Sequence, residues 1–294
     1  MCTPLPSLMR GTVPAMFACL VLAISWFSSV PSSYGSASWP NEPSNAGTIV
    51  DVPFNSLPSG GMYSAYNNYA IVGDSTAPLS PSNVIQFTRP PGQTGGDQVF
   101  TALPNMREVY LGFWWKPSNP FDGWLNNSNK LIFLKSPVLD NIVENMYGPR
   151  GGNRQLAFIL QLTTDNCHLP TGFGDCPGTY VLLPNASSGI TSLGQWHRIE
   201  VYVKHSTTRT SRDGILRWWV DGVLAGNFTT VNFQIEPWNE MHIVQAWDSP
   251  DPTQTSTDRH WFDHLRISQP GGSTATDQPP GPPATPTIRS VTVP

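Results

Sequence analysis

The chain has 294 residues, of which 30 are prolines, 25 are glycines and only 12% are charged. Hydrophobic residues make up 39%, which is enough for a core and excludes the low-hydrophobicity, high-charge class of disordered chains. The formal net charge of −4 excludes a basic nucleic-acid footprint, and so many prolines and glycines argue against a helical bundle. With 11 tryptophans beside many neutral polar residues, the composition suits a secreted β protein that binds hydroxylated ligands.

The first 37 residues have the pattern of a secretory signal peptide. Arg10 provides a short positive region, and the apolar run from Met16 to Phe27 is too short to span a bilayer. Small residues at 35–37 predict cleavage after Ala37. A membrane anchor is the alternative, but no stop-transfer pattern follows the run. We therefore expect a secreted protein with no membrane segment after cleavage.

The segment 38–270 is predicted to form one β domain. Short runs of β-branched and aromatic residues recur between clusters of Pro, Gly, Asn and Ser, and no run keeps a helical period for three turns. Strands are expected near 84–88, 107–116, 130–136, 155–164, 178–183, 195–205, 214–220, 223–230, 240–248 and 260–268. Strands without intervening helices predict an all-β fold, an antiparallel two-sheet sandwich.

The clearest local signal is the hairpin around Asp221-Gly222, because both positions of such a turn require positive φ. Side chains alternate along each flanking strand. Trp218 is therefore expected to point into the core, and Trp219 to point outward. On the preceding strand Glu200 points outward, so we interpret it as a member of a surface ion pair rather than a catalytic acid.

The run 107–116 differs, because aromatic residues lie on both of its faces. Tyr110, Trp114 and Lys116 alternate with an apolar set that is expected to face the core. Rings and a cation on the other face suit a sugar-binding cleft, in which a ring stacks on a pyranose and polar groups bind its hydroxyls. Gln161 is expected to lie on the corresponding face of 155–164. The alternative is a second core layer.

Two further features lie toward the C-terminus. Cys167 and Cys176 bracket a turn-rich loop and are the pair that remains after signal cleavage, which predicts a disulfide in an oxidising compartment. A zinc site is the alternative, but it would need two more ligands nearby, and only His168 and Asp175 are available. Residues 271–294 form a proline-rich linker, and its closing TPTIRSVTV resembles the first strand of a fibronectin type III module.

Three runs, GQWHRIEVYVK, DGILRWWVDGVL and HWFDHLRIS, resemble the concanavalin A-like lectin/glucanase superfamily. The likeness is greatest to its laminin-G-like modules and jelly-roll polysaccharide lyases, and it covers roughly residues 48–270. It implies a jelly roll whose concave sheet forms the ligand groove, and often a structural calcium ion. Asp263 matches the late acidic residue of that calcium site, and Asp51 is the early acid placed to assist. A plain hydrogen-bonding role for Asp263 is the alternative.

Catalytic patterns are incomplete. The glucanase run E-x-D-x-x-E, which brings two carboxylates to one face, is absent from the sequence. A lyase that acts by β-elimination needs a base, an acid and a group that neutralises the uronate carboxylate. The candidates for these roles are Tyr110, Lys116, Gln161, His242 and Gln245. A core histidine is the alternative for His242.

A metal site built from the late histidines is not expected. His260 and His264 are predicted to share a strand face about 13 Å apart, too far for one ion. We predict a secreted, monomeric polysaccharide-binding module with a concave glycan groove, with polysaccharide as its partner and neither nucleic acid nor membrane. The alternative is a polysaccharide lyase that acts by β-elimination on uronate-containing glycans.

Overall fold

The computed structural model describes residues 38–57, 62–63, 67–79, 83–93, 96–123, 129–137, 141–162, 178–208, 211–232, 237–246 and 251–271. All regular elements within these ranges are β-strands. No helix in this part of the chain has the length and apolarity needed to cross a membrane. The predicted signal peptide, the predicted Cys167–Cys176 disulfide and the linker from residue 272 onward lie outside the described residues.

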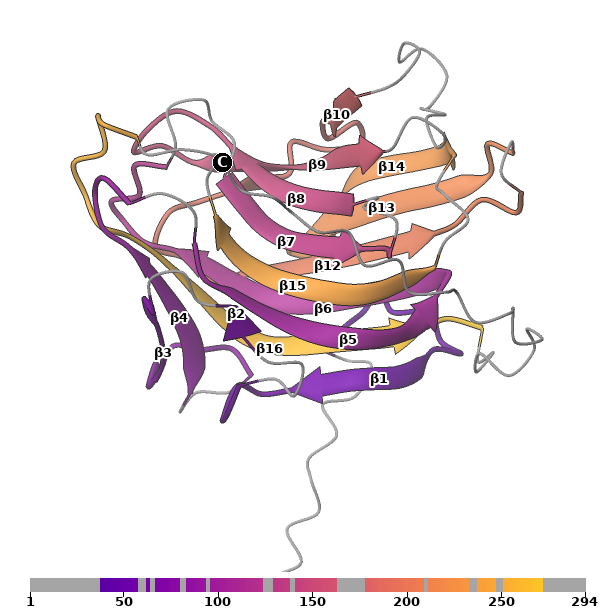
Figure 1. Cartoon of the computed structure of the whole chain (residues 1–294), viewed down its shortest axis with the longest axis horizontal. Helices are drawn as coiled ribbons and strands as arrows, with labels where there is room; N and C mark the ends of the chain where they lie inside the picture. The colour runs from indigo at the N-terminus through magenta and orange to yellow at the C-terminus, as the bar shows by residue number, and fades with distance from the viewer. Residues whose placement is uncertain are drawn as a thin grey trace, which may run out of the picture. The chain divides into compact units, whose positions relative to one another are not determined.

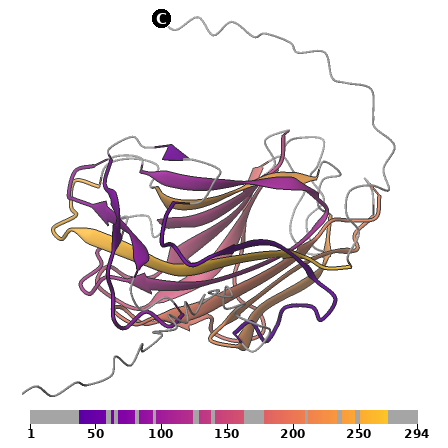
Figure 2. The same ribbon diagram turned by 90° about the horizontal axis from the view of Figure 1, so that it is seen from below.

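The described strands form two antiparallel sheets, each with eight strands. Sheet A has the order β14 (Val223–Val231), β13 (Gly214–Val220), β12 (His197–Lys204), β6 (Glu108–Pro117), β16 (Asp258–Gln269), β4 (Val84–Arg89) and β3 (Tyr69–Val72), and β1 (Gly47–Val52) also pairs with β16. Sheet B has the order β10 (Gly178–Leu182), β9 (Arg154–Leu162), β8 (Asn141–Tyr147), β7 (Asn129–Lys135), β15 (Trp238–Ala246), β5 (Gln98–Met106) and β2 (Met62–Tyr63), and β11 (Ile190–Thr191) pairs with β9. Figure 1 and Figure 2 show these sheets as two layers. The predicted all-β, two-sheet sandwich is confirmed.

Alternate side chains of both sheets meet in one core. Trp218 of β13 is fully buried, and its ring lies 4.9 Å from that of Phe158 on β9. A Cβ added at Gly226 on the neighbouring strand would lie 1.9 Å from the Trp218 ring, so only glycine leaves room for this indole. Trp219 is only partly buried. The predicted inward and outward orientations of these two tryptophans are confirmed.

The turn between β13 and β14 also follows the sequence prediction. Asp221 and Gly222 have φ values of 52° and 84°, the left-handed conformations that a two-residue hairpin of this type requires. The Asp221 carboxylate accepts a hydrogen bond of 2.8 Å from the backbone N–H of Arg198 and lies 2.7 Å from Nδ1 of His197. These contacts fix the hairpin against the strand that precedes it.

A β-bulge interrupts β16. The register shifts between Asp263 and Leu265, and His264 has a φ of 60°. His260, before the bulge, accepts a hydrogen bond from the buried indole of Trp115. His264, at the bulge, pairs with Asp51 of β1. The expectation that the two histidines share a face is therefore wrong, because the extra residue reverses the alternation.

Residues 38–46, here called the N-terminal segment, cover part of the outer face of sheet A. Trp39 is fully buried, and a Cβ added at Gly112 of β6 would lie 2.5 Å from its ring. Asn41 donates two hydrogen bonds to Glu200, of 2.9 Å and 3.0 Å. Glu200 does pair with Arg198, but it is fully buried. Its predicted surface position is wrong because this segment covers it.

Candidate functional site

The predicted site residues are divided between the two sheets. Tyr110 and Lys116 lie on β6 of sheet A, and His242 lies on β15 of sheet B. Gln161 and Gln245 also belong to sheet B, on β9 and β15, but their side chains are outside the described part. The inner faces of both sheets contribute to one core, so their outer faces point in opposite directions. The five lyase candidates therefore do not form a single site.

Tyr110 does not present its ring to solvent. It is fully buried, and its hydroxyl donates a 2.7 Å hydrogen bond to the buried Glu200. Burial, reinforced by the neighbouring carboxylate, raises the pKa of Tyr110 far above its ordinary value. The expectation that this ring stacks on a sugar is corrected here, because the N-terminal segment lies over this part of the face.

Trp114 and Lys116 lie on the outer face of sheet A and are partly buried. The Lys116 ammonium pairs with Asp74. It lies 4.7 Å from the ring centroid of Trp196 and 5.0 Å from that of Trp261. The aromatic and cationic groups predicted for this face are present, but a carboxylate already neutralises the cation. Glycan binding by Trp114 and Lys116 stays a prediction.

The two acids predicted for calcium have other partners among the described residues. The two carboxylate oxygens of Asp51 face His264 and Arg266, and Asp263 accepts a 2.7 Å hydrogen bond from the backbone N–H of Leu79. Calcium requires six to eight oxygen ligands, whereas Asp51 is surrounded by nitrogen donors. The described residues include no cluster of three or more His, Cys, Asp or Glu side chains that could hold a metal.

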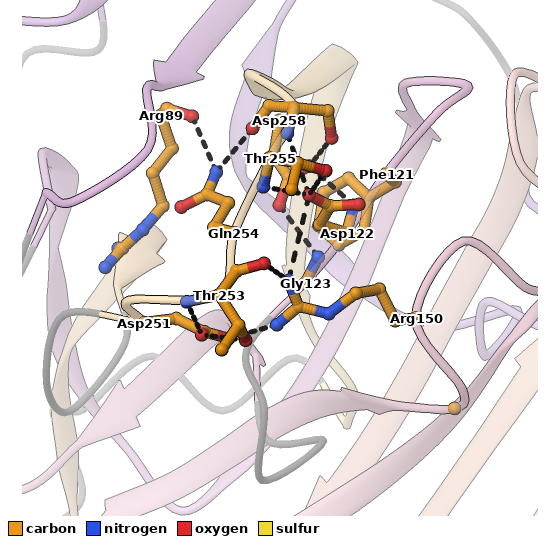
Figure 3. A network of polar contacts seen from close by, with 12 residues as sticks. Arg89, Phe121, Asp122, Gly123, Arg150, Asp251, Thr253, Gln254, Thr255 and Asp258 are labelled. Atoms are coloured by element: carbon orange, nitrogen blue, oxygen red, sulfur yellow. Dashed lines mark hydrogen bonds and ion pairs between the residues drawn. The ribbon is translucent and has the colours of Figure 1, made fainter.

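The carboxylates of Asp122 and Asp258 form a cluster that joins several loops (Figure 3). Asp258 accepts backbone hydrogen bonds of 2.7 Å and 2.8 Å from Asp122 and Gly123. Asp122 accepts bonds of 2.6 Å and 2.8 Å from the backbone of Thr255 and Ser256. Burial raises the pKa of Asp258 to about 6, whereas the backbone donors hold the pKa of Asp122 below its ordinary value despite burial.

Divergent pKa values in two adjacent carboxyl groups are also the pattern of an acid–base pair. Here, however, Asp258 is fully buried and Asp122 is 7% exposed. Arg154, also buried, donates to the backbone oxygens of Phe121 and Asp122. The cluster therefore fixes the loops to one another, and we assign it no catalytic role.

The outer face of sheet B carries a different set of side chains. Met241 and Ile243 of β15 belong to the core, so His242 between them points outward. The cross-strand partners of His242 are Phe100 on β5 and Phe133 on β7. Their ring centroids lie 5.6 Å and 6.3 Å from that of the imidazole. An imidazole between two phenyl rings therefore lies at the centre of this face, where Figure 1 shows β5, β15 and β7 side by side.

Hydrogen bonding orients the imidazole of His242. Its Nδ1 lies 2.7 Å from Oε1 of Gln98, and its Nε2 faces the carboxylate of Glu240. Burial lowers the pKa of His242, while the hydrogen bond to Glu240 opposes this shift. A lowered pKa favours the neutral ring, in which one nitrogen is unprotonated and can act as a general base.

Charged side chains surround the imidazole. Oε2 of Glu240 lies 2.9 Å from Nε2 of His242. Lys135 is the cross-strand partner of Glu240. The ammonium groups of Lys130 and Lys135 lie 6.0 Å and 5.5 Å from the ring centroid of Phe133. A base, two cations and aromatic rings thus lie together on one face.

Sequence analysis identified only His242 of this set. Gln98 and Phe100 belong to β5, which the sequence prediction omitted. The lysines lie on a predicted strand, but nothing in the sequence placed that strand beside β15. Strand β5 could have been found by its alternation. Buried residues, namely Val99, Thr101 and Leu103, alternate there with partly exposed ones.

Comparison with solved structures identifies the fold class. An endo-β-1,4-glucuronan lyase from the fungus Trichoderma reesei matches with a TM-score of 0.53 and 14% identity, over 76% of this chain and 96% of that chain. The alginate lyase vAL-1 from Chlorella virus matches with a TM-score of 0.50 and 12% identity, over 71% and 91%. A Bacillus licheniformis β-glucanase matches with a TM-score of 0.44 and 12% identity, over 75% and 98%. No family model and no curated protein matches the sequence.

This chain therefore has a jelly-roll fold similar to that of the two lyases, and the predicted fold is confirmed. At these identities the similarity shows the fold alone. Proteins with one fold perform different reactions, so the function has to be argued from the site.

Proposed function

We propose that this protein binds a uronate-containing polysaccharide on the outer face of sheet B. The observation that carries the proposal is the set of groups near His242: lysines at 130 and 135, and the partly exposed phenyl ring of Phe100. Aromatic rings stack on the C–H face of a sugar ring, and the lysines supply charge for the uronate carboxylates. The lyases of similar fold, which are described as acting on glucuronan and alginate, support the choice of an acidic chain.

A second candidate is cleavage of the bound chain by β-elimination. The specific observation in its favour is the imidazole of His242, whose pKa is lowered by burial and whose ring is oriented by the contacts with Gln98 and Glu240. In this reaction Nε2 takes the proton at C5, a double bond forms between C4 and C5, and the C4–O bond breaks. The leaving oxygen takes up a proton, which the imidazolium can deliver if both atoms lie on one side of the sugar ring. Glu240 then stabilises the imidazolium.

The test uses purified protein with glucuronan, alginate and a neutral β-1,4-glucan. Binding is measured by calorimetry, and cleavage by the ultraviolet absorbance of the unsaturated uronate product. We expect both acidic chains to bind more tightly than the neutral one. Failure to bind either acidic chain would refute the proposal. Binding without absorbance would refute the lyase candidate and retain the binding function.

The variant His242→Gln separates the two candidates. It keeps a polar side chain between the phenyl rings but removes the base. We expect the variant to bind acidic chains within a few-fold of the wild type and to lose cleavage. An unchanged thermal midpoint checks that the fold is intact. Retained cleavage would exclude His242 as the base.

A further inference from the structure

Glu240 occupies the approach to the imidazole. Its side chain is 36% exposed, whereas that of His242 is 8% exposed. Nε2 of His242 has no accessible surface of its own, and Oε2 of Glu240 lies 2.9 Å from it. A ligand that meets Nε2 must therefore displace the Glu240 carboxylate.

The contact that would be broken is one that a ligand carboxylate can replace. Oε2 of Glu240 lies at hydrogen-bond distance from Nε2 of His242, 2.9 Å, and this contact opposes the lowering of the His242 pKa by burial. A ligand carboxylate at the same position could make the same contact, so the exchange would leave the imidazole with an acidic partner.

The surroundings suit an acidic ligand group at the same position. Lys135 is directly opposite Glu240 across the β7–β15 pair, where Cβ atoms are separated by about 5 Å. A uronate carboxylate that replaced Glu240 would therefore meet the same cation and the same imidazole. While Glu240 stays in place, its negative charge instead repels an approaching uronate.

We infer that Glu240 is an internal substitute for the ligand carboxylate and limits the affinity of this site for acidic chains. The inference rests on the proposed function and deepens it, because it names a residue that sets specificity. It makes Glu240 a residue that opposes binding rather than one that contributes to it. Removal of its charge should then strengthen binding of uronate chains and leave neutral chains unaffected.

The experiment compares the full chain with Glu240→Gln and Glu240→Ala. The first variant removes the charge and keeps the shape, and the second also excludes a new amide contact to Nε2. The control is Glu108→Gln, which removes one negative charge on β6 of the other sheet, where Glu108 accepts a 2.5 Å hydrogen bond from Tyr202. The probes are β-1,4-linked glucuronate and glucose hexamers, and the readout is the dissociation constant. Where the hexamer is cleaved, KM takes its place.

We expect both Glu240 variants to bind the glucuronate hexamer roughly tenfold more tightly, a change of about 1.4 kcal/mol. The control should bind as the wild type does, and no variant should change affinity for the glucose hexamer. Equal or weaker binding of glucuronate by the Glu240 variants, with the wild type binding, would overturn the inference alone. Absence of glucuronate binding in every protein would instead refute the proposed function.

Discussion

Glu144 is a carboxyl group buried between the two sheets. It lies on β8, is fully buried, and neither of its oxygens has a hydrogen-bond partner among the described residues. Its strand neighbours are Ile132 and Phe158. Burial raises the pKa of Glu144 from 4.5 to about 8. The group is therefore protonated in the folded protein at neutral pH, and replacing it should alter how stability depends on pH.

The sign and size of the effect follow from proton linkage. Between 4.5 and about 8 the unfolded chain has released this proton and the folded chain keeps it, so the free energy of unfolding falls as pH rises. The slope is about 1.4 kcal/mol per pH unit. From pH 6 to pH 8 the loss is then on the order of 2–3 kcal/mol. Asp258, whose pKa is raised to about 6, contributes mainly below this window. Burial lowers the pKa values of His205 and His260 from 6.5 to about 3, so these two groups raise stability as pH increases through 6.5 and oppose the Glu144 contribution.

The perturbations are Glu144→Met and Glu144→Gln, and the assay is urea unfolding at intervals between pH 6 and pH 8. Both variants remove the titrating group, so each should gain roughly 2–3 kcal/mol relative to the wild type between pH 6 and pH 8. Met should also be the more stable of the two, since Gln leaves an unpaired amide in the core. A difference between variant and wild type that stays constant over this range would refute the reasoning.

Three further predictions concern the fold. Trp218→Ala should lower the free energy of unfolding by roughly 3–5 kcal/mol, and Trp219→Ala should lower it by far less, because only the Trp218 ring fills the core. Equal losses for the two variants in chemical denaturation would contradict this prediction. Asn41→Ala keeps the backbone donor but removes the side-chain donor to the buried Glu200, which should cost about 1–3 kcal/mol. Asn45→Ala, exposed in the same segment, should be neutral, and similar effects of the two substitutions would count against the docking of this segment. A chelator should leave the thermal midpoint unchanged, because both carboxylate oxygens of Asp51 already face nitrogen donors, and a drop of several degrees would reveal a bound ion.

The strands that the sequence predicted well have one polar and one apolar face. The β12–β13–β14 run is the clearest case, because strict alternation and the Asp-Gly turn agree on the same register. Strands β5 and β8 were not predicted. Pro104 lies inside β5, and β8 contains Glu144 in place of an apolar core residue. A proline or a charged residue interrupts the apolar alternation by which a strand is recognised in a sequence.

The site was harder to predict than the fold, for a topological reason. Its side chains come from residues near 98–100, 130–135 and 240–242, which are brought together only because β15 lies between β5 and β7. Sequence alone does not specify that order of strands. The role expected of Tyr110 failed for a related reason, since alternation shows which way a side chain points but not that a distant segment covers it.

The most direct test of the account is to find which face of the sandwich a uronate chain contacts. In a titration of isotope-labelled protein with a glucuronate oligomer, NMR reports the imidazole of His242 on sheet B and the indoles of Trp114, Trp196 and Trp261 on sheet A separately. The account predicts saturable shifts of the His242 ring signals, with the three indole signals unchanged. Shifts confined to the indoles, with His242 unaffected, would contradict it and place the glycan on sheet A.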